Sequence, residues 1–517
     1  MADAGKYDVI IVGSGLGGLI CGALLSKMEG MKVLILEKNA DVGGKIMSYG
    51  YNHNPDLTEE EYRESLGVCG HSKIVYSKPD FPEIMEKYGL FKNYIIDTGW
   101  HQMSLGPRNR FAQVAAALGK KIPISPTIGF LYYEDERWKQ LSEIAASWPK
   151  ESQEERKRVA RFTSTISKEE SHAYDDVDYD SFLKSITSDQ RVIDYYGLMG
   201  CYSCGLNCPT TVSAGEIIRV NNMNNYAGMH FERGGGGGVV TGGFKIVANV
   251  FEEVIVEHGG EIRTKNRVRE ILVEDRKAVG VRVKPSEGQE YEVRAPIIIN
   301  NIPPRHMGNV LAKEYWPLEL QRRIDSQYAQ AGLLGFIGLK EPIEKDPRGK
   351  AGNFSIRKLP GTEDLGVIGG ASIFSFQQTS EADPSRAPAG KCIMDVWVCL
   401  YPNTPFGPSE ISNEKLIQTL IDRIYDFFRN KYPQWDEIYE WGYFTRAKEV
   451  YGMSNSPGQT GATRLPIKHP TVGNLFHTGE DLATWGIATD SVGLSALLAV
   501  SEATGKDYTK LIAPWGR

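Results

Sequence analysis

Apolar runs at the start of the chain predict two buried strands around one helix. Residues 7–12 read Tyr-Asp-Val-Ile-Ile-Val, and residues 32–36 form a second short run. Continuous apolar runs of this length are typical of strands in a parallel sheet covered on both faces. Between them, an apolar-periodic stretch extends through Leu25 and predicts a helix. The pattern therefore predicts the first strand, helix and strand of an α/β fold.

The turn between the first strand and the helix contains a glycine-rich motif. It reads Gly13-Ser14-Gly15-Leu16-Gly17-Gly18, and Glu37 ends the second strand. An acid about 20 residues beyond Gly-x-Gly-x-x-Gly, with both strands and the helix in register, is the dinucleotide-binding fingerprint. Without these flanking elements, the motif would indicate only an ordinary glycine-rich turn.

Each position of the fingerprint has a physical task. Gly13 permits a tight turn, Gly15 lets the backbone approach a pyrophosphate, and Gly18 lets the helix pack closely on the strand. The helix N-terminus presents N–H groups and the positive end of its dipole to the phosphates. Glu37 is suited to accept hydrogen bonds from a ribose diol. It would repel a 2′-phosphate, which argues against an NADP-type ligand.

Apolar patterns further along the chain predict more elements of both kinds. Alternation predicts strands, and a period near 3.6 predicts helices. Residues 134–189 are rich in charge and helix formers, whereas residues 220–230 show no clear period. Residues 416–431 predict an amphipathic helix that packs on a core rather than on a membrane. The predicted strands are residues 263–273, 278–283, 295–300, 332–339 and 392–400.

Length and charge narrow the classes of function. A chain of 517 residues is too long for one hydrophobic core, so several domains or one domain with large insertions are expected. A net charge of −6 gives no reason to expect binding to nucleic acid. No apolar run has the length of a membrane-spanning helix, and the N-terminus has no signal-peptide pattern. We therefore expect a cytoplasmic protein, with contact to a membrane surface left open.

Three of the seven cysteines form a cluster. Cys201, Cys204 and Cys208, followed by a proline, match the second half of an iron–sulfur motif. The position expected for a further ligand is Leu198, and no histidine is near. We therefore expect free cysteines and no metal. The role of the cluster stays open.

The residues after Glu37 carry a resemblance to a known family. Lys38 follows directly, and a short spacer leads to Gly43-Gly44-Lys45. This pattern resembles FAD-dependent oxidoreductases of the phytoene desaturase, carotenoid isomerase and amine oxidase superfamily. In that family the paired glycines pass close to the cofactor. Residues 95–99 resemble the strand and turn that usually follow, and residues 51–91 are expected to form an inserted surface element.

Two later segments extend the resemblance. The glycine run at residues 234–238 and a helix at 244–257 resemble the return of the chain to the FAD domain, although a flexible hinge is an alternative. The resemblance places Val268 against adenine and Gly479 with Glu480 near the pyrophosphate and ribityl chain. It directs the N-terminus of the last helix, with Ile487, Ala488 and Thr489, at the flavin ring. We expect Thr489 or Asp490 to cap that helix, and His477 to be a packed strand residue.

The resemblance implies a Rossmann-like FAD-binding domain with a doubly wound parallel sheet and an interleaved α+β substrate domain. The FAD-binding parts are predicted at residues 1–104, 231–304 and 466–517. The substrate domain is predicted at residues 105–230 and 305–465.

The implied function is hydride exchange between FAD and a carbon of an apolar substrate, such as a terpenoid, carotenoid or alicyclic compound. A C=C bond would be made, reduced or isomerised. One alternative is a flavin amine oxidase, although the aromatic-rich pattern expected before Gly486 is absent apart from Trp485. Others are a hydratase or isomerase without net redox chemistry, and a non-catalytic protein like the prenyl-protein escorts.

Candidate residues for the substrate cavity come from positions beside these motifs. His101, Gln102 and Trp485 are the candidates, and each could equally be structural. The chain contains one complete dinucleotide fingerprint, so NAD(P)H is not expected as an obligatory partner. Oxygen or a quinone-like acceptor is expected to exchange electrons instead.

The first prediction is that each chain binds one FAD without a covalent link, because the fingerprint is complete and no flavin-attachment motif is evident. The purified protein should show a flavin absorption spectrum, and acid precipitation should release the pigment. A colourless protein that takes up no FAD on reconstitution would contradict the prediction.

Overall fold

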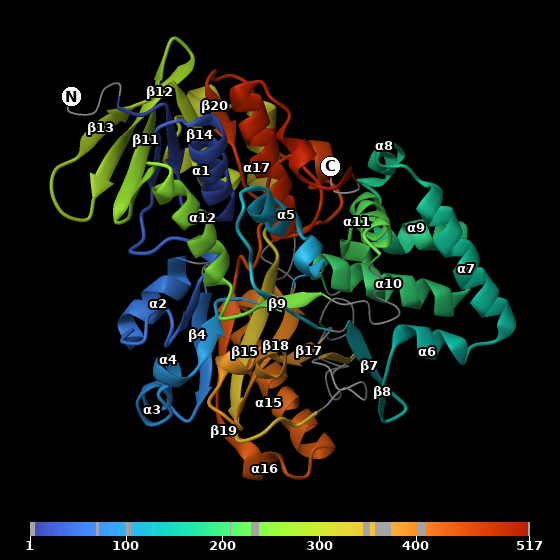
Figure 1. The fold of residues 1–517 in the computed structure, drawn as a ribbon. Helices are drawn as coiled ribbons and strands as arrows, with labels where there is room; N and C mark the ends of the chain where they lie inside the picture. Colours follow the sequence, from blue (N-terminus) through green and yellow to red (C-terminus); the bar gives the residue numbers. More distant parts are fainter. Residues whose placement is uncertain are drawn as a thin grey trace.

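A five-stranded parallel sheet organises one half of the molecule (Figure 1). The computed structural model describes residues 6–68, 72–99, 103, 105–127, 129–206, 208–228, 237–344, 352–356, 374–400, 409–514 and 517. The strand order is β10 (Glu261–Arg263), β2 (Val33–Leu36), β1 (Val9–Val12), β14 (Ile297–Asn300) and β20 (Leu475–His477). All neighbouring strands are parallel, as the apolar runs predict.

Three helices from distant parts of the sequence pack together beside this sheet. They are α1 (Leu16–Glu29), α12 (Lys245–Glu257) and α17 (Thr489–Thr504). Helix α1 lies between the other two and is buried from Leu16 through Ser26, because neighbours cover it on both sides (Figure 1). The short helix α5 (Arg110–Ala117) packs against α17. The prediction assigns this helix to the substrate domain, but Phe111 and Val114 belong to the same core as the parallel sheet.

A second, mostly antiparallel sheet of eight strands lies in the other half of the molecule. Helix α15 (Glu414–Lys431) packs on it with the apolar positions that its sequence pattern predicts. The strand order is β4 (Ser72–Lys78), β19 (Tyr439–Ala447), β15 (Ala331–Leu339), β18 (Cys392–Leu400), β17 (Phe374–Gln378), β16 (Asn353–Ile356), β7 (Phe130–Glu134) and β8 (Arg137–Lys139).

The segment expected as a surface insertion is instead part of this second half, so that expectation is wrong. Its strand β4 pairs with β19, although residues 1–104 are predicted as one nucleotide-binding segment. Helix α2 (Glu59–Val68) buries Tyr62, whose hydroxyl lies 2.8 Å from that of Tyr443. The polar composition belongs to the outer face of α2, which begins with three glutamates. Helices α3 (Phe81–Lys87) and α4 (Leu90–Asn93) complete the segment.

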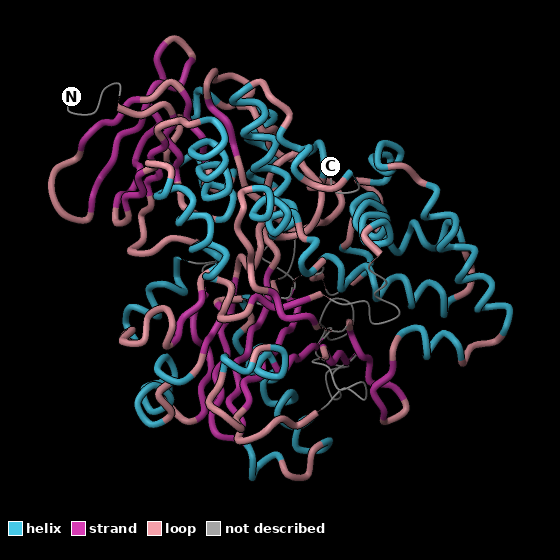
Figure 2. The backbone as a smooth tube through the Cα atoms, viewed as in Figure 1, coloured by secondary structure: helices cyan, strands magenta, loops and turns pink. Residues whose placement is uncertain are grey.

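Helices dominate the described part of residues 141–226, which we call the helical region, and they gather on one side of the molecule (Figure 2). The helix formers at residues 134–189 indicate part of it. Helix α11 (Ala214–Tyr226) occupies part of the segment without a clear period. It is buried on several sides, so it has no continuous polar face that would produce one. The others are α6 (Leu141–Ala146), α7 (Lys150–Thr165), α8 (Lys168–Ser171), α9 (Tyr179–Ile186) and α10 (Gln190–Cys204).

The remaining elements are small. A three-stranded antiparallel sheet contains β11 (Asn266–Glu274), β12 (Lys277–Pro285) and β13 (Tyr291–Arg294). Two pairs consist of β3 (Ser48–Gly50) with β5 (Ile95–Asp97) and β6 (Ile124–Pro126) with β9 (Gly238–Val240). The short helices are α13 (Leu318–Ser326), α14 (Thr379–Ala382) and α16 (Trp435–Ile438). Among the helices described, none has the length and apolar character to span a membrane.

Candidate functional site

A cavity of about 860 Å³ lies at the carboxyl edge of the parallel sheet and extends to the helical region. Most of the predicted cofactor-binding residues line it: Gly13, Gly15, Leu16, Gly17, Glu37, Lys38, Gly43, Gly44, Lys45, Val268, Gly479, Glu480, Ile487, Ala488 and Thr489. Three separate segments of the chain thus meet around one space. That these residues bind a cofactor stays a prediction.

The glycine motif forms a turn with little room for side chains. Gly13 has φ +95°, a conformation that favours glycine. A Cβ at Gly15 would lie 2.5 Å from Asn301 Nδ2, and a Cβ at Gly17 would lie 2.5 Å from Thr478 Oγ1. A Cβ at Gly18 would lie 2.3 Å from the Gly13 carbonyl oxygen, in accord with close helix–strand packing.

Glu37 is fixed at the end of β2 by hydrogen bonds from the backbone. Its Oε2 accepts from the N–H of Ser14 at 2.9 Å and from the Ser14 hydroxyl at 2.8 Å. Its Oε1 accepts from the N–H of Asn39 at 2.9 Å. The carboxylate therefore supports the glycine turn and also lines the cavity. Ser14 is buried and does not line the cavity among the residues described, so its role there is to hold the Glu37 carboxylate in place.

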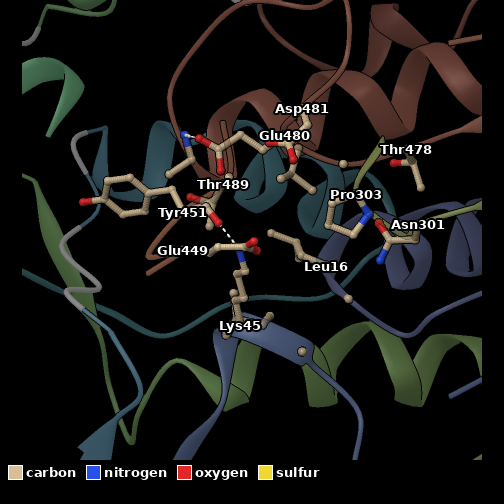
Figure 3. Close-up of a pocket in the computed structure, with 18 of the residues that line it drawn as sticks. Leu16, Lys45, Asn301, Pro303, Glu449, Tyr451, Thr478, Glu480, Asp481 and Thr489 are labelled. Carbon is tan, nitrogen blue, oxygen red and sulfur yellow. Dashed lines mark hydrogen bonds and ion pairs between the residues drawn. The ribbon is translucent and has the colours of Figure 1, made fainter. Parts of the chain in front are cut away.

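A partly buried charged cluster lies on one wall of the cavity, and sequence reasoning missed most of it (Figure 3). Arg305 pairs with Glu449 at 2.9 Å and with Asp481 at 2.8 Å. Lys45 donates to the Tyr451 carbonyl and lies 3.9 Å from Glu449. Burial lowers the pKa of Lys45. The only local signals are that Arg305 follows a strand-breaking proline pair and that Asp481 follows the Gly479-Glu480 turn.

The loop before α17 presents the start of that helix to the cavity. No side chain in the described part of the chain caps the helix, and its N-cap residue is Ala488 with φ +50°. The expected cap by Thr489 or Asp490 is therefore wrong. Asp490 Oδ1 instead accepts from the backbone N–H of Arg110 at 3.1 Å. Glu480 Oε1 accepts from the Ala488 N–H at 3.0 Å, and burial raises the pKa of Glu480 to about 7.

The part of the cavity formed by the helical region is mainly apolar. Asn224 on α11 is an exception: its side chain is buried, and its Oδ1 has no hydrogen-bond partner among the residues described. An unsatisfied buried amide is costly, so it indicates a place for a polar ligand atom. The apolar residues from the helical region are Met199 on α10 and Val220 and Met223 on α11. Further apolar surface comes from Met103 and from Phe130 and Tyr132 on β7.

The proposed substrate-cavity candidates have different outcomes. Trp485 is buried, and the Arg110 guanidinium carbon lies 4.2 Å from the centre of its ring. Trp485 is not among the described residues that line the cavity. Its assignment to the substrate cavity is wrong, because its ring packs against the Arg110 guanidinium and is not part of the cavity wall. His101 and Gln102 lie outside the described residues. His477 is a packed strand residue, as expected: it is buried beside His469, and burial lowers its pKa.

Two other predicted features are only partly visible. Residues 234–236 of the glycine run lie outside the described residues, but a strand pair and α12 follow the run. Cys201 and Cys204 are buried and Cys208 is partly exposed, all as free thiols. Their lack of metal stays a prediction.

Comparisons with known proteins agree with this arrangement. A family model described as flavin containing amine oxidoreductase matches residues 16–504. The chain is similar to an inactive all-trans-retinol 13,14-reductase of Danio rerio, with 24% identity over 310 residues, 57% of this chain and 47% of the relative. It thus spans about half the length of that relative.

Two relatives align over more of their length. The 4,4'-diapophytoene desaturase (4,4'-diapolycopene-forming) of a Methylomonas species is 24% identical over 436 residues, 78% of this chain and 75% of the relative. The chloroplastic prolycopene isomerase of Daucus carota is 23% identical over 511 residues, 92% of this chain and 76% of the relative.

Solved structures share the fold. An oxidoreductase from Methanosarcina mazei has a TM-score of 0.67 at 17% identity, covering 96% of this chain and 99% of that one. Wild-type putrescine oxidase bound to putrescine has a TM-score of 0.63 at 15% identity, covering 97% of this chain and 99% of that one. At these identities the similarity concerns the fold alone.

The residues present fit a flavin nucleotide. The glycine turn offers backbone without side chains, as a bound pyrophosphate requires. The uncapped end of α17 offers N–H groups and a positive dipole end to a group that carries negative charge.

Two glycine substitutions should separate binding from folding. Gly15→Val should abolish flavin binding with little loss of stability, because its Cβ meets only the end of the Asn301 side chain within the protein. Gly18→Val should lower the melting temperature sharply, because its Cβ meets backbone. Flavin absorbance and thermal unfolding measure the two effects. Equal loss of stability in both variants would contradict this account.

Proposed function

Because this chain belongs to the flavin-containing amine oxidoreductase family, we propose that it is an FAD-dependent oxidoreductase that makes, reduces or isomerises a C=C bond of a largely apolar substrate. The observation that carries the proposal is that one cavity is lined at one end by the glycine turn and at the other end by mainly apolar side chains, which we call the apolar compartment. Sequence similarity to a desaturase and an isomerase supports the same class of reaction.

FAD, when bound, supplies hydride transfer. The turn at Gly13 and Gly15 would hold its pyrophosphate, and Glu37 and Val268 would hold the adenosine end. The N-terminus of α17 would lie against the ring that reacts, where its dipole stabilises negative charge. The apolar walls would exclude water from the reacting carbon.

The apolar compartment defines the substrate class. Met103, Phe130 and Met199 offer apolar surface, and Asn224 offers a single unsatisfied amide oxygen. Such a lining suits an apolar chain or ring system that carries one hydrogen-bond donor, for example a hydroxyl group. Electrons would be exchanged with oxygen or with a quinone-like acceptor, and contact with a membrane surface would give access to apolar substrates.

Amine oxidation is the second candidate, because the family description names amine oxidoreductases and putrescine oxidase shares this fold. A cationic amine would need an available carboxylate or an aromatic cage. Among the described residues of the cavity, Glu449 and Asp481 are already paired with Arg305, and Asp490 accepts from the backbone N–H of Arg110. The other two carboxylates also have hydrogen-bond donors: Glu480 accepts from the Ala488 N–H and has a raised pKa because of burial, and Glu37 accepts from Ser14 and Asn39. This charge balance favours an uncharged substrate.

An anaerobic experiment tests the proposal. The oxidised or dithionite-reduced protein is mixed separately with polyenes, cyclic alkenes, amines and NAD(P)H, and the flavin spectrum is followed. We expect a response to an apolar alkene or its saturated product and slow or no reduction by NAD(P)H. Rapid reduction by amines alone would favour the second candidate, and rapid reduction by NAD(P)H alone would contradict both. An isomerase without net redox chemistry would turn over without an acceptor.

The substrate class predicts a selective effect at Asn224. Asn224→Leu should raise KM about tenfold or more for a hydroxylated substrate, because a hydrogen bond at a buried site is lost. The matching hydrocarbon should be unaffected or bound more tightly. Asn225→Leu is the matched control, since Asn225 is the exposed neighbour on the same helix. An equal effect on both substrates would show that Asn224 does not recognise a polar group.

A further inference from the structure

The loop that leads into α17 has a strained conformation, and contacts from several elements hold it. We call residues 485–488 the α17 loop. Ala488 has φ +50°, which is unusual for a residue with a Cβ. Gly486 has φ +106°, and a Cβ there would lie 2.5 Å from Arg110 Nη1. Strained backbone persists only where surrounding contacts hold it, so the contacts of this loop are informative.

The hydrogen bond to the backbone of Gly486 comes from the helical region rather than from the half that contains the parallel sheet. The N–H of Gly486 donates to Glu216 Oε1 at 2.7 Å, across 270 residues of sequence. Glu216 lies on α11 and is 1% exposed. The other polar contacts of the loop include the Ala488 N–H to Glu480 and the Arg110 guanidinium to the Trp485 carbonyl at 3.1 Å. From the helical region, Lys168 also lies 5.4 Å from the Trp485 ring centre, and Ile487 packs against the apolar core of that region. Glu216 is therefore the link from α11 to the loop among these contacts.

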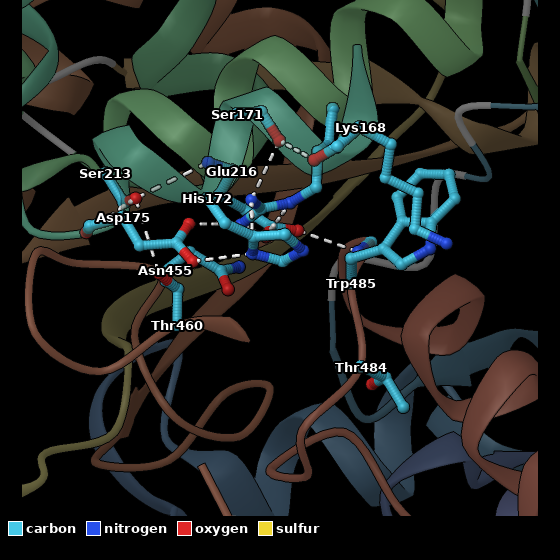
Figure 4. A network of polar contacts seen from close by, with 12 residues as sticks. Lys168, Ser171, His172, Asp175, Ser213, Glu216, Asn455, Thr460, Thr484 and Trp485 are labelled. Carbon is cyan, nitrogen blue, oxygen red and sulfur yellow. Dashed lines mark hydrogen bonds and ion pairs between the residues drawn. The ribbon is translucent and has the colours of Figure 1, made fainter. Parts of the chain in front are cut away.

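A buried network holds the Glu216 carboxylate in place (Figure 4). Its Oε2 accepts from Arg219 Nη2 at 2.7 Å, and the same Nη2 donates to Asp175 Oδ1 at 2.6 Å. Arg219 Nη1 also donates to the Ser171 hydroxyl at 3.1 Å. The Arg219 side chain is fully buried. Arg219 pairs with Glu216 as well as with Asp175, so the Glu216 carboxylate is not an isolated buried charge and its Oε1 is held toward the loop.

The face of α11 that carries Glu216 also lines the cavity. Val220, Met223 and Asn224 follow at helical spacings of four, seven and eight residues, which places them on the side of Glu216. The loop contributes Ile487 and Ala488 to the same cavity. One helix face thus contacts both the space assigned to the substrate and the loop assigned to the cofactor.

We propose that Glu216 is a positioning residue that fixes the α17 loop, and with it the N-terminus of α17, relative to the substrate-side face of α11. The consequence for the reaction rests on the proposed function: the hydrogen bond sets where the helix dipole lies against the flavin and how far the substrate wall lies from it. The anchoring itself depends only on the contacts described above.

Hydrogen–deuterium exchange of the full-length protein without added substrate tests the anchoring. Glu216→Ala should speed exchange in the peptide that contains residues 484–489 by about tenfold or more, because a charge-assisted bond is lost. Glu216→Gln retains an acceptor oxygen and should restore most of the protection. Asp175→Asn is the matched control, since it disturbs Arg219 without touching the loop.

Glu216→Asp covers the case in which Glu216→Ala does not fold. It retains the charge opposite Arg219 but shortens the side chain, so it should also speed exchange in the loop. Unchanged exchange in both of these variants would overturn the proposal. Equal acceleration in Asp175→Asn would also overturn it, because the effect would then be a general loss of packing.

A second measurement connects the anchor to the cofactor. In Glu216→Asp the midpoint potential of the bound flavin should become more negative and kcat should fall with KM unchanged, whereas Asp175→Asn should leave both near wild type. Faster loop exchange with an unchanged potential and kcat would overturn the role in positioning the cofactor. A wild-type protein that binds no flavin would refute the proposed function, and the exchange result would still stand.

Discussion

One row of backbone hydrogen bonds beyond the carboxyl edge of the parallel sheet determines the site. The N–H of Gly13 donates to the Leu36 carbonyl, that of Asn301 to Val12, and that of Thr478 to Asn300, each at 2.9 Å. These bonds extend the strand pairing into the turns that follow β1, β14 and β20. Segments separated by hundreds of residues are thereby held at one edge, where ligands of open parallel sheets bind.

This constraint explains why side chains are absent where the segments meet. Gly15 and Gly17 face Asn301 and Thr478 so closely that a methyl group would push the ends of these two side chains aside. Glu37 stabilises the turn through the Ser14 and Asn39 N–H groups and also contributes to the cavity wall. The same residues therefore hold the fold together and leave backbone exposed for a phosphate group. A substitution at Glu37 would therefore affect both the stability of the turn and ligand binding, whereas one at Gly15 would mainly affect ligand binding.

The sequence predicts the elements whose signals are local. The buried strands, the amphipathic helix α15 and the glycine turn follow from runs, periods and spacings within short windows. It does not predict contacts between distant residues: Arg305 and Glu449 are 144 residues apart, and Glu216 and Gly486 are 270 apart. Periodicity also fails for α11, which is buried on several sides. Trp485 shows a further limit, since proximity to a motif does not indicate which side of a loop faces the cavity.

We propose that one continuous cavity accommodates a whole flavin dinucleotide, from Glu37 and Val268 at one end to the N-terminus of α17 at the other. Calorimetric titration of the apoprotein with FAD and with FMN tests this claim most directly. FMN lacks the adenosine monophosphate part of FAD, so it cannot form the hydrogen bonds proposed for the adenosine end. The account predicts that FAD binds at least about a hundredfold more tightly than FMN. Equal affinities for FAD and FMN would contradict it.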